Sequence, residues 1–447
     1  MRRVITYGTY DLFHEGHRRL LERAKELGDW LIVGVTTENY DEGRGKLNVR
    51  QPLMERIHQV QESGLADEVI IEEYEGQKIN DIQKHGVDIF AIGSDWLGKF
   101  DYLKDYCDVV YLDRTKGVSS TELRNEVGML NLGVVGTGRI ANRFIDEAHF
   151  VSGVEITGAW SRNAVNVKDF TERHELQLAA GSYDELLDGV DAVYIASPHL
   201  THLDYATTAM KAGKHVLCEK PMAQSEAECQ QLYQTADEND VVLLEAIKTA
   251  YSPGFQRMVA VARSGSIGDI RSVDATFTKL THGDLRELDI DQAGGSINEL
   301  ASYPLLAIVK LLGQEYRDLR TVSYRDGADG VDLYSRMDFV YPHAVASARA
   351  GLGVKAEGDL IIGGTSGYLY VPAPWWKTEY FEVRFENQTE NKKFYYKFAG
   401  DGLRYEIAEF GSMIRRGITD TFRLRRSESA WIARVMDQGR TDALTIG

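Results

Sequence analysis

Two strand–glycine turn–helix units constrain what this 447-residue chain can fold into. The first reads Gly-Thr-Tyr-Asp-Leu-Phe-His-Glu-Gly-His at residues 8–17, between an apolar run at 4–7 and a helical pattern at 18–27. The second reads Gly-Thr-Gly-Arg-Ile-Ala at residues 136–141, directly after the apolar run 130–135. A glycine turn that opens a helix offers backbone N–H groups and the positive end of the helix dipole to a phosphate. The sequence therefore predicts two nucleotide sites and two activities.

Strand and helix patterns alternate through the first part of the chain. Strand patterns lie at 4–7, 31–36, 68–71, 89–92 and 109–111, and helical patterns at 18–27, 53–62, 78–85 and 120–127. Short connections between such elements favour a parallel sheet with helices on both faces. The next strand begins at residue 130, so we place a domain boundary near Gly128.

The alternation resumes after this boundary and then changes character. Strand patterns follow at 130–135, 154–160, 192–196, 215–217 and 241–244. Beyond about residue 270, longer patterns of period two appear at 271–278, 331–340, 345–352, 359–363 and 380–385. Such strands are typical of a mainly antiparallel sheet. We expect three domains, at residues 1–128, 129–250 and 251–447.

Composition excludes several classes of protein. The net charge of −17 argues against a general surface for nucleic acid or anionic membranes. The sequence has no apolar run of about 18 residues, so we expect no membrane span. The early first strand leaves no room for a signal peptide. The three cysteines have neither metal-ligand nor disulfide spacing, which favours a cytoplasmic protein.

His14 and His17, spaced i, i+3 at a helix start, can face one ligand. By themselves they are equally consistent with phosphate chemistry, half of a metal site or polar capping. Further motifs accompany them in order: Gly-Ser-Asp-Trp at 93–96, Gly-Lys-Phe-Asp at 98–101 and Arg-Thr-Lys-Gly-Val-Ser-Ser-Thr at 114–121. Together they make residues 1–127 resemble a glycerol-3-phosphate cytidylyltransferase, of the cytidylyltransferase family and the nucleotidyltransferase superfamily. Val118 and Ser120 depart mildly from the last family motif.

The resemblance implies that a phosphate monoester attacks the α-phosphorus of CTP and releases pyrophosphate. His14 and His17 are expected to donate to the phosphates, and Lys46 to neutralise the attacking phosphate. Mg²⁺ is expected to accompany CTP, held mostly by phosphate oxygens and water, and no protein ligand is assigned to it. The implied catalytic residues are His14, His17, Lys46 and Arg114. The implied CTP site comprises Gly8, Thr9, Tyr10, His14, His17, Asp95, Trp96, Arg114, Ser119 and Thr121.

The second glycine turn follows a strand and opens a helix, as the dinucleotide-binding fingerprint requires. An acidic residue that would bind the ribose of NAD is absent after the next strand, where Ser161, Arg162 and Asn163 stand instead. A hydroxyl and a guanidinium suit a 2′-phosphate, so we expect NADPH, although Arg162 could also only stack on adenine.

A Cys-Glu-Lys-Pro motif at 218–221 follows a later strand. With the fingerprint and the appended sheet, it makes residues 130–447 resemble the Gfo/Idh/MocA oxidoreductase family. The resemblance implies that Lys220 hydrogen-bonds the reacting oxygen and that Pro221 shapes the nicotinamide pocket. The implied cofactor-binding residues are Gly136, Gly138, Arg139, Ile140, Ser161, Arg162, Ser197, Pro198, His202, Glu219 and Lys220.

The third motif of that family is altered in this chain. Glu299, Ala301 and Tyr303 stand where Asp, Gly and His are usual. Glu299 can still position substrate hydroxyls. Tyr303 can still donate a proton to a carbonyl, with Lys220 nearby expected to lower its pKa. The departures also allow a domain that has lost its catalysis.

The expected fold is α/β: a Rossmann-like nucleotidyltransferase domain, a dinucleotide-binding Rossmann domain and an appended, mainly antiparallel α+β sheet domain. The joint function is expected to be NADPH-dependent reduction of a sugar phosphate, such as fructose 6-phosphate, ribulose 5-phosphate or a triose phosphate. Cytidylyl transfer to the alditol phosphate then gives a CDP-alditol for capsule or teichoic-acid-type polymers. The alternatives are an independent dehydrogenase working in the opposite direction and a second domain that only binds or oligomerises. The resemblance also predicts a homo-oligomer.

Overall fold

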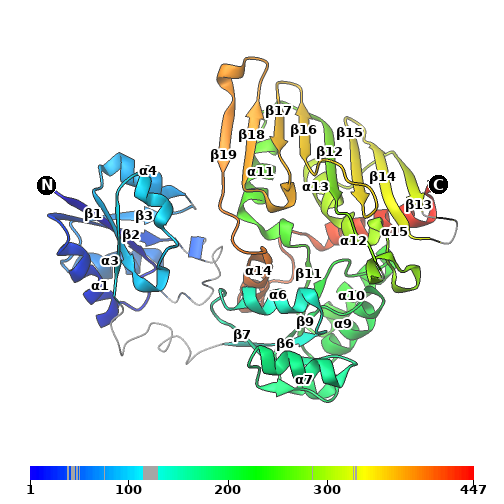
Figure 1. Cartoon of the computed structure of the whole chain (residues 1–447), viewed down its shortest axis with the longest axis horizontal. Helices are drawn as coiled ribbons and strands as arrows, with labels where there is room; N and C mark the ends of the chain where they lie inside the picture. Colours follow the sequence, from blue (N-terminus) through cyan, green and yellow to red (C-terminus); the bar gives the residue numbers. More distant parts are fainter. Residues whose placement is uncertain are drawn as a thin grey trace. The chain divides into compact units, whose positions relative to one another are not determined.

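The computed structural model describes residues 1–37, 40–41, 46, 49, 51–74, 76–113, 129–283, 285–325, 327 and 330–446. The chain separates into two compact units, residues 1–129 with 150–153, and residues 130–149 with 154–447 (Figure 1). Within the described ranges, no helix combines the length and the apolar character needed to cross a bilayer.

The first unit contains a five-stranded parallel sheet with the order β3-β2-β1-β4-β5. Its strands are β1 (Arg3–Gly8), β2 (Trp30–Thr36), β3 (Glu68–Glu72), β4 (Ile89–Gly93) and β5 (Asp108–Leu112). Its helices are α1 (Glu15–Lys25), α3 (Leu53–Glu62) and α4 (Gln77–His85), with short η1 (Ser94–Trp96) and η2 (Asp101–Asp105). The helix expected at 120–127 lies outside the described residues.

Helices cover both faces of this sheet because neighbouring strand residues point to opposite sides. Val4 packs in one apolar cluster with Leu21 of α1 and Val60 of α3. Ile5, the next residue, packs in a second cluster with Ile82 of α4. Central parallel strands are buried on both faces in this way, which explains their continuous apolar sequences.

The second unit begins with a six-stranded parallel sheet with the order β11-β10-β9-β6-β7-β8. Its strands are β6 (Leu130–Val135), β7 (Val154–Trp160), β8 (Leu178–Ala179), β9 (Ala192–Ile195), β10 (His215–Glu219) and β11 (Leu243–Ala246). Its helices are α6 (Arg139–Ala148), α7 (Ala164–Arg173), α8 (Tyr183–Asp188), η3 (His199–Thr201), α9 (His202–Lys211), α10 (Glu226–Glu238) and η4 (Lys248–Tyr251).

A nine-stranded sheet follows, with the order β19-β18-β17-β16-β12-β15-β14-β13-β20. The strands are β12 (Ile270–Thr278), β13 (Asp318–Arg325), β14 (Asp332–Val340), β15 (Val345–Gly351), β16 (Leu360–Gly364), β17 (Tyr368–Val371), β18 (Tyr380–Arg384), β19 (Lys392–Tyr395) and β20 (Leu444–Ile446). Only the β12–β15 and β13–β20 pairs among these described strands are parallel, so the sheet is mainly antiparallel, as expected.

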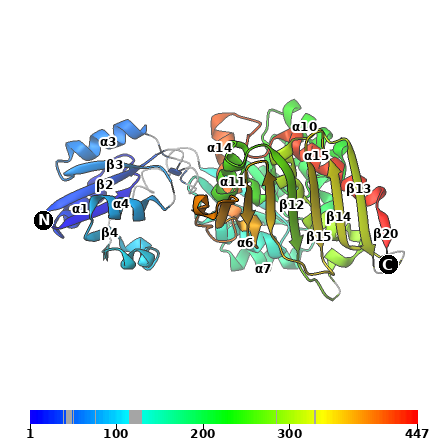
Figure 2. The same cartoon turned by 90° about the horizontal axis from the view of Figure 1, so that it is seen from above.

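The helices of this part are α11 (Pro253–Arg263), α12 (Ser296–Leu300), α13 (Ser302–Leu312), α14 (Leu403–Arg416) and α15 (Arg426–Thr441). Short turns are η5 (Arg286–Leu288), η6 (Ile290–Gln292), η7 (Trp375–Lys377) and η8 (Gln388–Glu390). Helices α12 and α13 pack on β12, β14 and β15, and α15 packs on α10 and α13. Figure 2 shows α10 and α15 on one side of this sheet. Helices α12 and α13 thereby hold Glu299 and Tyr303 in place.

A buried ion pair fastens α13 to α15. Lys310 of α13 donates from Nζ to both carboxylate oxygens of Glu428 at 3.0 and 3.1 Å and to the carbonyl of Phe422 at 2.6 Å. Lys310 is 7 % exposed and Glu428 is 9 % exposed. Removing one partner from such a pair leaves an uncompensated buried charge.

We therefore expect Lys310→Met to lower the free energy of unfolding of the second unit by about 3–5 kcal/mol, measured by urea denaturation. The double variant Lys310→Met/Glu428→Leu removes both charges and is expected to recover at least half of that loss. Equal destabilisation in the single and double variants would contradict this interpretation.

Candidate active sites

The first glycine turn lies at the carboxyl end of β1. A Cβ on Gly8 would lie 2.9 Å from the ring of Tyr10, which is itself buried, with φ of 54°. His14 is the N-cap of α1, where its Nδ1 accepts a hydrogen bond from the backbone N–H of Gly16 at 3.0 Å. The rings of His14 and His17 stack with centroids 4.0 Å apart. The turn thus brings both imidazoles together at a helix N-terminus, as predicted from the sequence.

A buried polar network supports this turn from behind. Lys46 Nζ donates to Thr9 Oγ1 at 2.7 Å, and Thr9 Oγ1 donates to Asp41 Oδ1 at 3.0 Å. Arg56 is fully buried, donates from Nη1 to the carbonyls of Thr9 and Thr36 at 2.8 Å, and lies 3.6 Å from Asp41 Oδ2. Asp41 and Arg56 together orient the backbone of the turn and the ammonium group of Lys46.

Sequence reasoning assigned no role to Asp41 or Arg56. In the sequence, Arg56 is a single arginine beside Glu55, and Asp41 is an acidic residue in a polar stretch. Neither residue has a characteristic spacing from a motif that would indicate its role. Asp95 and Trp96 lie in η1 after β4, so they lie at the same sheet edge as His14. Arg114, Ser119 and Thr121, predicted to contact the triphosphate, lie outside the described residues.

The second glycine turn joins β6 to α6. Gly136 has φ of +108°, and a Cβ there would lie 2.6 Å from the carbonyl oxygen of Ala196. Gly138 is the N-cap of α6, and a Cβ on it would face open space. Only glycine suits the first position, whereas the second leaves room for a group bound at the start of α6.

The end of β7 provides the second expected part of a dinucleotide site. Trp160, Ser161, Arg162 and Asn163 line the same cavity as Gly136. Asn163 is the N-cap of α7, and its side chain accepts from the backbone N–H groups of Val165 and Asn166. Arg162 is exposed at the cavity rim, with no carboxylate partner among the described residues.

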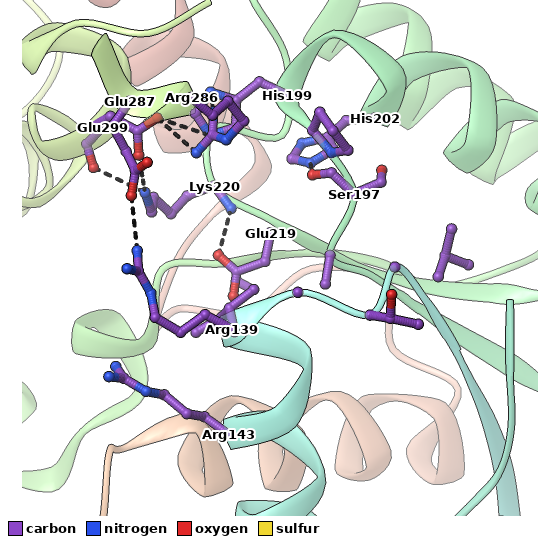
Figure 3. Close-up of a pocket in the computed structure, with 18 of the residues that line it drawn as sticks. Arg139, Arg143, Ser197, His199, His202, Glu219, Lys220, Arg286, Glu287 and Glu299 are labelled. Atoms are coloured by element: carbon purple, nitrogen blue, oxygen red, sulfur yellow. Dashed lines mark hydrogen bonds and ion pairs between the residues drawn. The ribbon is translucent and has the colours of Figure 1, made fainter. Parts of the chain in front are cut away.

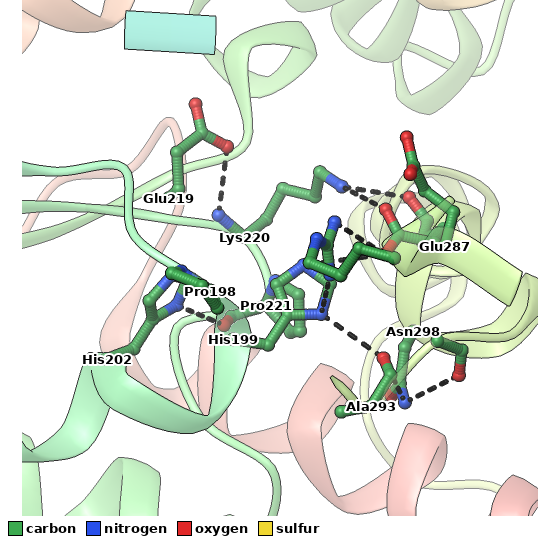
Figure 4. A network of polar contacts seen from close by, with 12 residues as sticks. Pro198, His199, His202, Glu219, Lys220, Pro221, Glu287, Ala293 and Asn298 are labelled. Atoms are coloured by element: carbon green, nitrogen blue, oxygen red, sulfur yellow. Dashed lines mark hydrogen bonds and ion pairs between the residues drawn. The ribbon is translucent and has the colours of Figure 1, made fainter. Parts of the chain in front are cut away.

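Four charged or titratable side chains from separate segments meet deeper in this cavity (Figure 3). The carboxylate of Glu299 lies 2.9 Å from Arg286, 3.7 Å from His199 and 3.9 Å from Lys220. Lys220 Nζ also donates to the backbone carbonyl of Glu299 at 2.9 Å (Figure 4). Burial, aided by Lys220, His202 and Arg286, holds the pKa of His199 well below its usual range. His199 is therefore neutral at pH 7 and can accept or donate a hydrogen bond.

Tyr303 lines the cavity one turn after Glu299, and its ring contacts that of Phe277 at 5.1 Å between centroids. The expectation that Lys220 lowers the pKa of Tyr303 is wrong. Burial raises this pKa, and the nearby carboxyl groups of Glu219, Glu406 and Glu299 raise it further. Tyr303 therefore stays protonated, so it can act as a hydrogen-bond donor but not as a phenolate base.

His202, predicted to bind the cofactor, lines the cavity but is almost fully buried, and both of its ring nitrogens face backbone carbonyls. Its Nδ1 lies 2.9 Å from the carbonyl of Pro221, and its Nε2 lies 2.8 Å from the carbonyl of Ser197. It thereby joins the segment that carries Lys220 to the turn after β9. Glu219 accepts from Tyr194 at 2.5 Å, and burial raises its pKa.

The cavity has a volume of about 670 Å³ and runs from the end of β7 to the sheet domain. Every residue predicted to bind the dinucleotide lines it: Gly136, Gly138, Arg139, Ile140, Ser161, Arg162, Ser197, Pro198, His202, Glu219 and Lys220. These residues fit a dinucleotide, because the space beside Gly138 is open at a helix N-terminus. Sequence reasoning missed Arg286, Arg143 and Lys248, which belong to no motif.

We expect Gly136→Ala to weaken NADPH binding by at least about tenfold and to lower the Tm by about 3 °C, because it adds a clash and a strained φ. Fluorescence titration and thermal unfolding measure both effects. The matched control, Gly138→Ala, is expected to weaken NADPH binding while leaving the Tm of the ligand-free protein unchanged. If Gly136→Ala kept the wild-type NADPH affinity and the wild-type Tm, the turn would not need a glycine at this position of positive φ.

Comparison with known proteins agrees with this division into two sites. Residues 5–126 match the cytidylyltransferase-like family, and residues 130–247 match the oxidoreductase family with an NAD-binding Rossmann fold. The chain is 50 % identical over 130 residues to glycerol-3-phosphate cytidylyltransferase of Bacillus spizizenii, covering 29 % of this chain and all of that protein.

The second unit has more distant relatives. Trans-1,2-dihydrobenzene-1,2-diol dehydrogenase of Sus scrofa is 27 % identical over 322 residues, covering 70 % of this chain and 96 % of that protein. The 3-ketoreductase KijD10 of Actinomadura kijaniata, solved with NADP and TDP-benzene, has a TM-score of 0.65 at 25 % identity, covering 71 % of this chain and 98 % of that one. The chain therefore belongs to the cytidylyltransferase family through its N-terminal domain and carries a Gfo/Idh/MocA-type oxidoreductase domain after it.

Proposed function

We propose that the chain is a bifunctional enzyme that reduces a sugar phosphate with NADPH and then transfers CMP from CTP to the resulting alditol phosphate. The observation that supports this proposal is that a single chain contains two sites. One is suited to the reduction of a carbonyl group, and the other is suited to the activation of a phosphate monoester. Reduction of a sugar phosphate leaves its phosphate in place, and that phosphate is the group which the first site would join to CMP. The products are a CDP-alditol and pyrophosphate.

In the first site, the alditol phosphate oxygen attacks the α-phosphorus of CTP as the bond to pyrophosphate breaks. His14 and His17 are placed to donate to phosphate oxygens at the N-terminus of α1, where negative charge builds on the leaving group. Lys46, held by Thr9, neutralises the incoming phosphate. Catalysis of this kind needs positioning and charge stabilisation more than covalent chemistry. Mg²⁺ is expected with CTP.

In the second site, the dinucleotide supplies the hydride when it is bound. Lys220 and Tyr303 both line the cavity, and each can donate a hydrogen bond to the carbonyl oxygen of the substrate. Tyr303 remains protonated and can pass its proton to the developing alkoxide, while Lys220 stabilises the negative charge. Glu299 orients Lys220 and can bind a substrate hydroxyl.

Fructose 6-phosphate, ribulose 5-phosphate and triose phosphates are the candidate substrates, of which we favour fructose 6-phosphate. A CDP-alditol is an activated donor, so we propose a role in capsule or teichoic-acid-type polymer synthesis in the cytoplasm. We further propose that residues 1–128, 129–250 and 251–447 act as cytidylyltransferase, cofactor and substrate domains. A homo-oligomer remains a prediction from the family resemblance.

The opposite redox direction is the second candidate function, because one relative is named as a diol dehydrogenase. An enzyme of this kind would oxidise an alditol or its CDP derivative with NADP⁺. A domain without catalysis is the third candidate. The assembled Lys220, Glu299 and Tyr303 cluster favours an active site over that candidate.

The decisive experiment follows NADPH absorbance with a panel of triose, pentose and hexose phosphates, then adds CTP and measures pyrophosphate. We expect NADPH loss with one sugar phosphate, followed by CTP-dependent pyrophosphate release. His17→Ala is expected to abolish pyrophosphate release and leave NADPH oxidation intact, and Lys220→Ala to do the reverse. Loss of both activities in either folded variant would contradict independent sites. Pyrophosphate release only from a ready-made alditol phosphate, or NADP⁺ reduction by a CDP-alditol, would favour the alternatives.

The cofactor preference has its own test. We expect Arg162→Gln to raise the KM for NADPH by about tenfold, because the guanidinium contacts the 2′-phosphate, and to leave the KM for NADH unchanged. Equal changes for both cofactors would show that Arg162 only stacks on adenine.

A further inference from the structure

Lys and Arg side chains are concentrated in the reductase cavity, although the protein as a whole is acidic. Among the described residues, seven Lys or Arg side chains line this cavity against three Glu side chains, although the whole chain has a net charge of −17. Neither the hydride step nor the cofactor 2′-phosphate needs all of these cations. These cations differ in whether a carboxylate of the protein already neutralises them.

Two arginines of the cavity are neutralised within the protein. Arg139 lies 2.8 Å from Glu287, a pair that Figure 3 shows beside Arg143, and Arg286 lies 2.9 Å from Glu299. Lys220 has the carbonyl of Glu299 and, at 3.9 Å, its carboxylate.

Arg143 of α6 and Lys248 of η4 differ from these groups. Arg143 lies 3.6 Å from the carboxylate of Asp401, which also lies 3.9 Å from Lys377. Lys248 Nζ donates to the backbone carbonyl of Asp401 at 2.8 Å and has no carboxylate at ion-pair distance among the described residues. Asp401 thus contacts three cations, Arg143 and Lys377 through its carboxylate and Lys248 through its backbone carbonyl, and of these Arg143 and Lys248 line the cavity.

The carboxyl groups of Glu406 and Glu219 stabilise the Lys248 ammonium only in part, since burial still lowers the pKa of Lys248. Glu147 is occupied by Arg404, at 2.7 and 2.8 Å from its two oxygens. Burial raises the pKa of Glu219 and raises that of Glu406 well above its usual range, which favours their neutral forms. Burial also lowers the pKa of Lys248, so an anion bound beside it would hold the proton on its amine.

We propose that Arg143 and Lys248 bind the phosphate group of the sugar-phosphate substrate in the reductase cavity. This inference rests on the proposed function and specifies how that site selects a phosphorylated substrate. Arg143 supplies a planar donor fork and Lys248 supplies a point charge, a combination suited to a phosphate monoester. Asp401 positions both cations while leaving them a net positive charge.

The first test compares Lys248→Met and Arg143→Gln with Lys377→Met. Lys377 shares Asp401 but does not line the cavity, so it is the matched control. Each of the first two variants is expected to raise the KM for the sugar phosphate by at least about tenfold, the usual effect of losing one charge-assisted contact, with the KM for NADPH within about twofold of wild type. Lys377→Met is expected to change neither. A raised KM for NADPH with an unchanged KM for the sugar phosphate would overturn the proposal in favour of cofactor binding.

The second test needs no turnover and separates this proposal from the proposed function. Inorganic phosphate is titrated by calorimetry into full-length protein saturated with NADP⁺ and CTP, so that both nucleotide sites are filled. Wild type and Lys377→Met are expected to show a binding event that Lys248→Met and Arg143→Gln lack, with unchanged circular dichroism in all four proteins. Because Lys46 offers a separate phosphate site in the first unit, the number of bound phosphates is compared, and the wild-type number in both variants would overturn the proposal. Loss of binding in the variants, together with no reduction of any sugar phosphate by the wild type, would overturn the proposed function but retain the anion site.

Discussion

The geometry of the candidate site in the second unit depends on the ion pairs and hydrogen bonds of Glu299. The Glu299 carboxylate lies among Arg286, His199 and Lys220, which come from three segments far apart in sequence. Burying a carboxylate costs free energy unless cations and hydrogen bonds surround it. The cations in turn need the carboxylate, because two positive groups in a partly buried cavity repel each other. The sheet domain, through α12, thus determines where Lys220 of the dinucleotide domain points.

The same arrangement occurs in the first unit with different residues. There the buried Asp41 lies between Thr9, Thr36 and Arg56, and Arg56 also binds two backbone carbonyls at the ends of β1 and β2. In both units a glycine turn at the carboxyl edge of a parallel sheet opens a helix. In each unit a buried carboxylate helps to hold a lysine: Asp41 holds Lys46 through Thr9, and Glu299 of α12 holds Lys220. The glycines provide space, and the buried charges provide orientation.

Charge explains how one acidic chain can serve anionic substrates. The whole chain has a net charge of −17, whereas seven Lys or Arg side chains of the described residues line the cavity of the second unit. Two of these cations, Arg143 and Lys248, contact Asp401, the first at its carboxylate and the second at its backbone carbonyl. In the proposed function, a phosphate that stays on the substrate during reduction would use this charge in the second unit and remain available to the first. One group of the substrate would then link the two reactions.

The sequence by itself determined both glycine turns, the parallel sheets that follow from strand–helix alternation, and the turn and strand-end residues of the second unit that line its cavity. These features are local, because turn, cap and strand preferences act over a few residues. The strands Asp318–Arg325, Tyr368–Val371, Lys392–Tyr395 and Leu444–Ile446 were not predicted, since each is polar or short and gains its order from neighbouring strands.

Only the tertiary structure decided which charges meet. Lys220 and Glu299 are 79 residues apart, and Lys248 and Asp401 are 153 apart, so no spacing in the sequence reveals either contact. The direction of the pKa shift of Tyr303 was mispredicted for the same reason. Sequence reasoning counted the neighbouring Lys220 but could not count the burial of the ring or the carboxyl groups of Glu219 and Glu406. Local patterns determine where a chain turns, whereas desolvation and charge pairing depend on the complete fold.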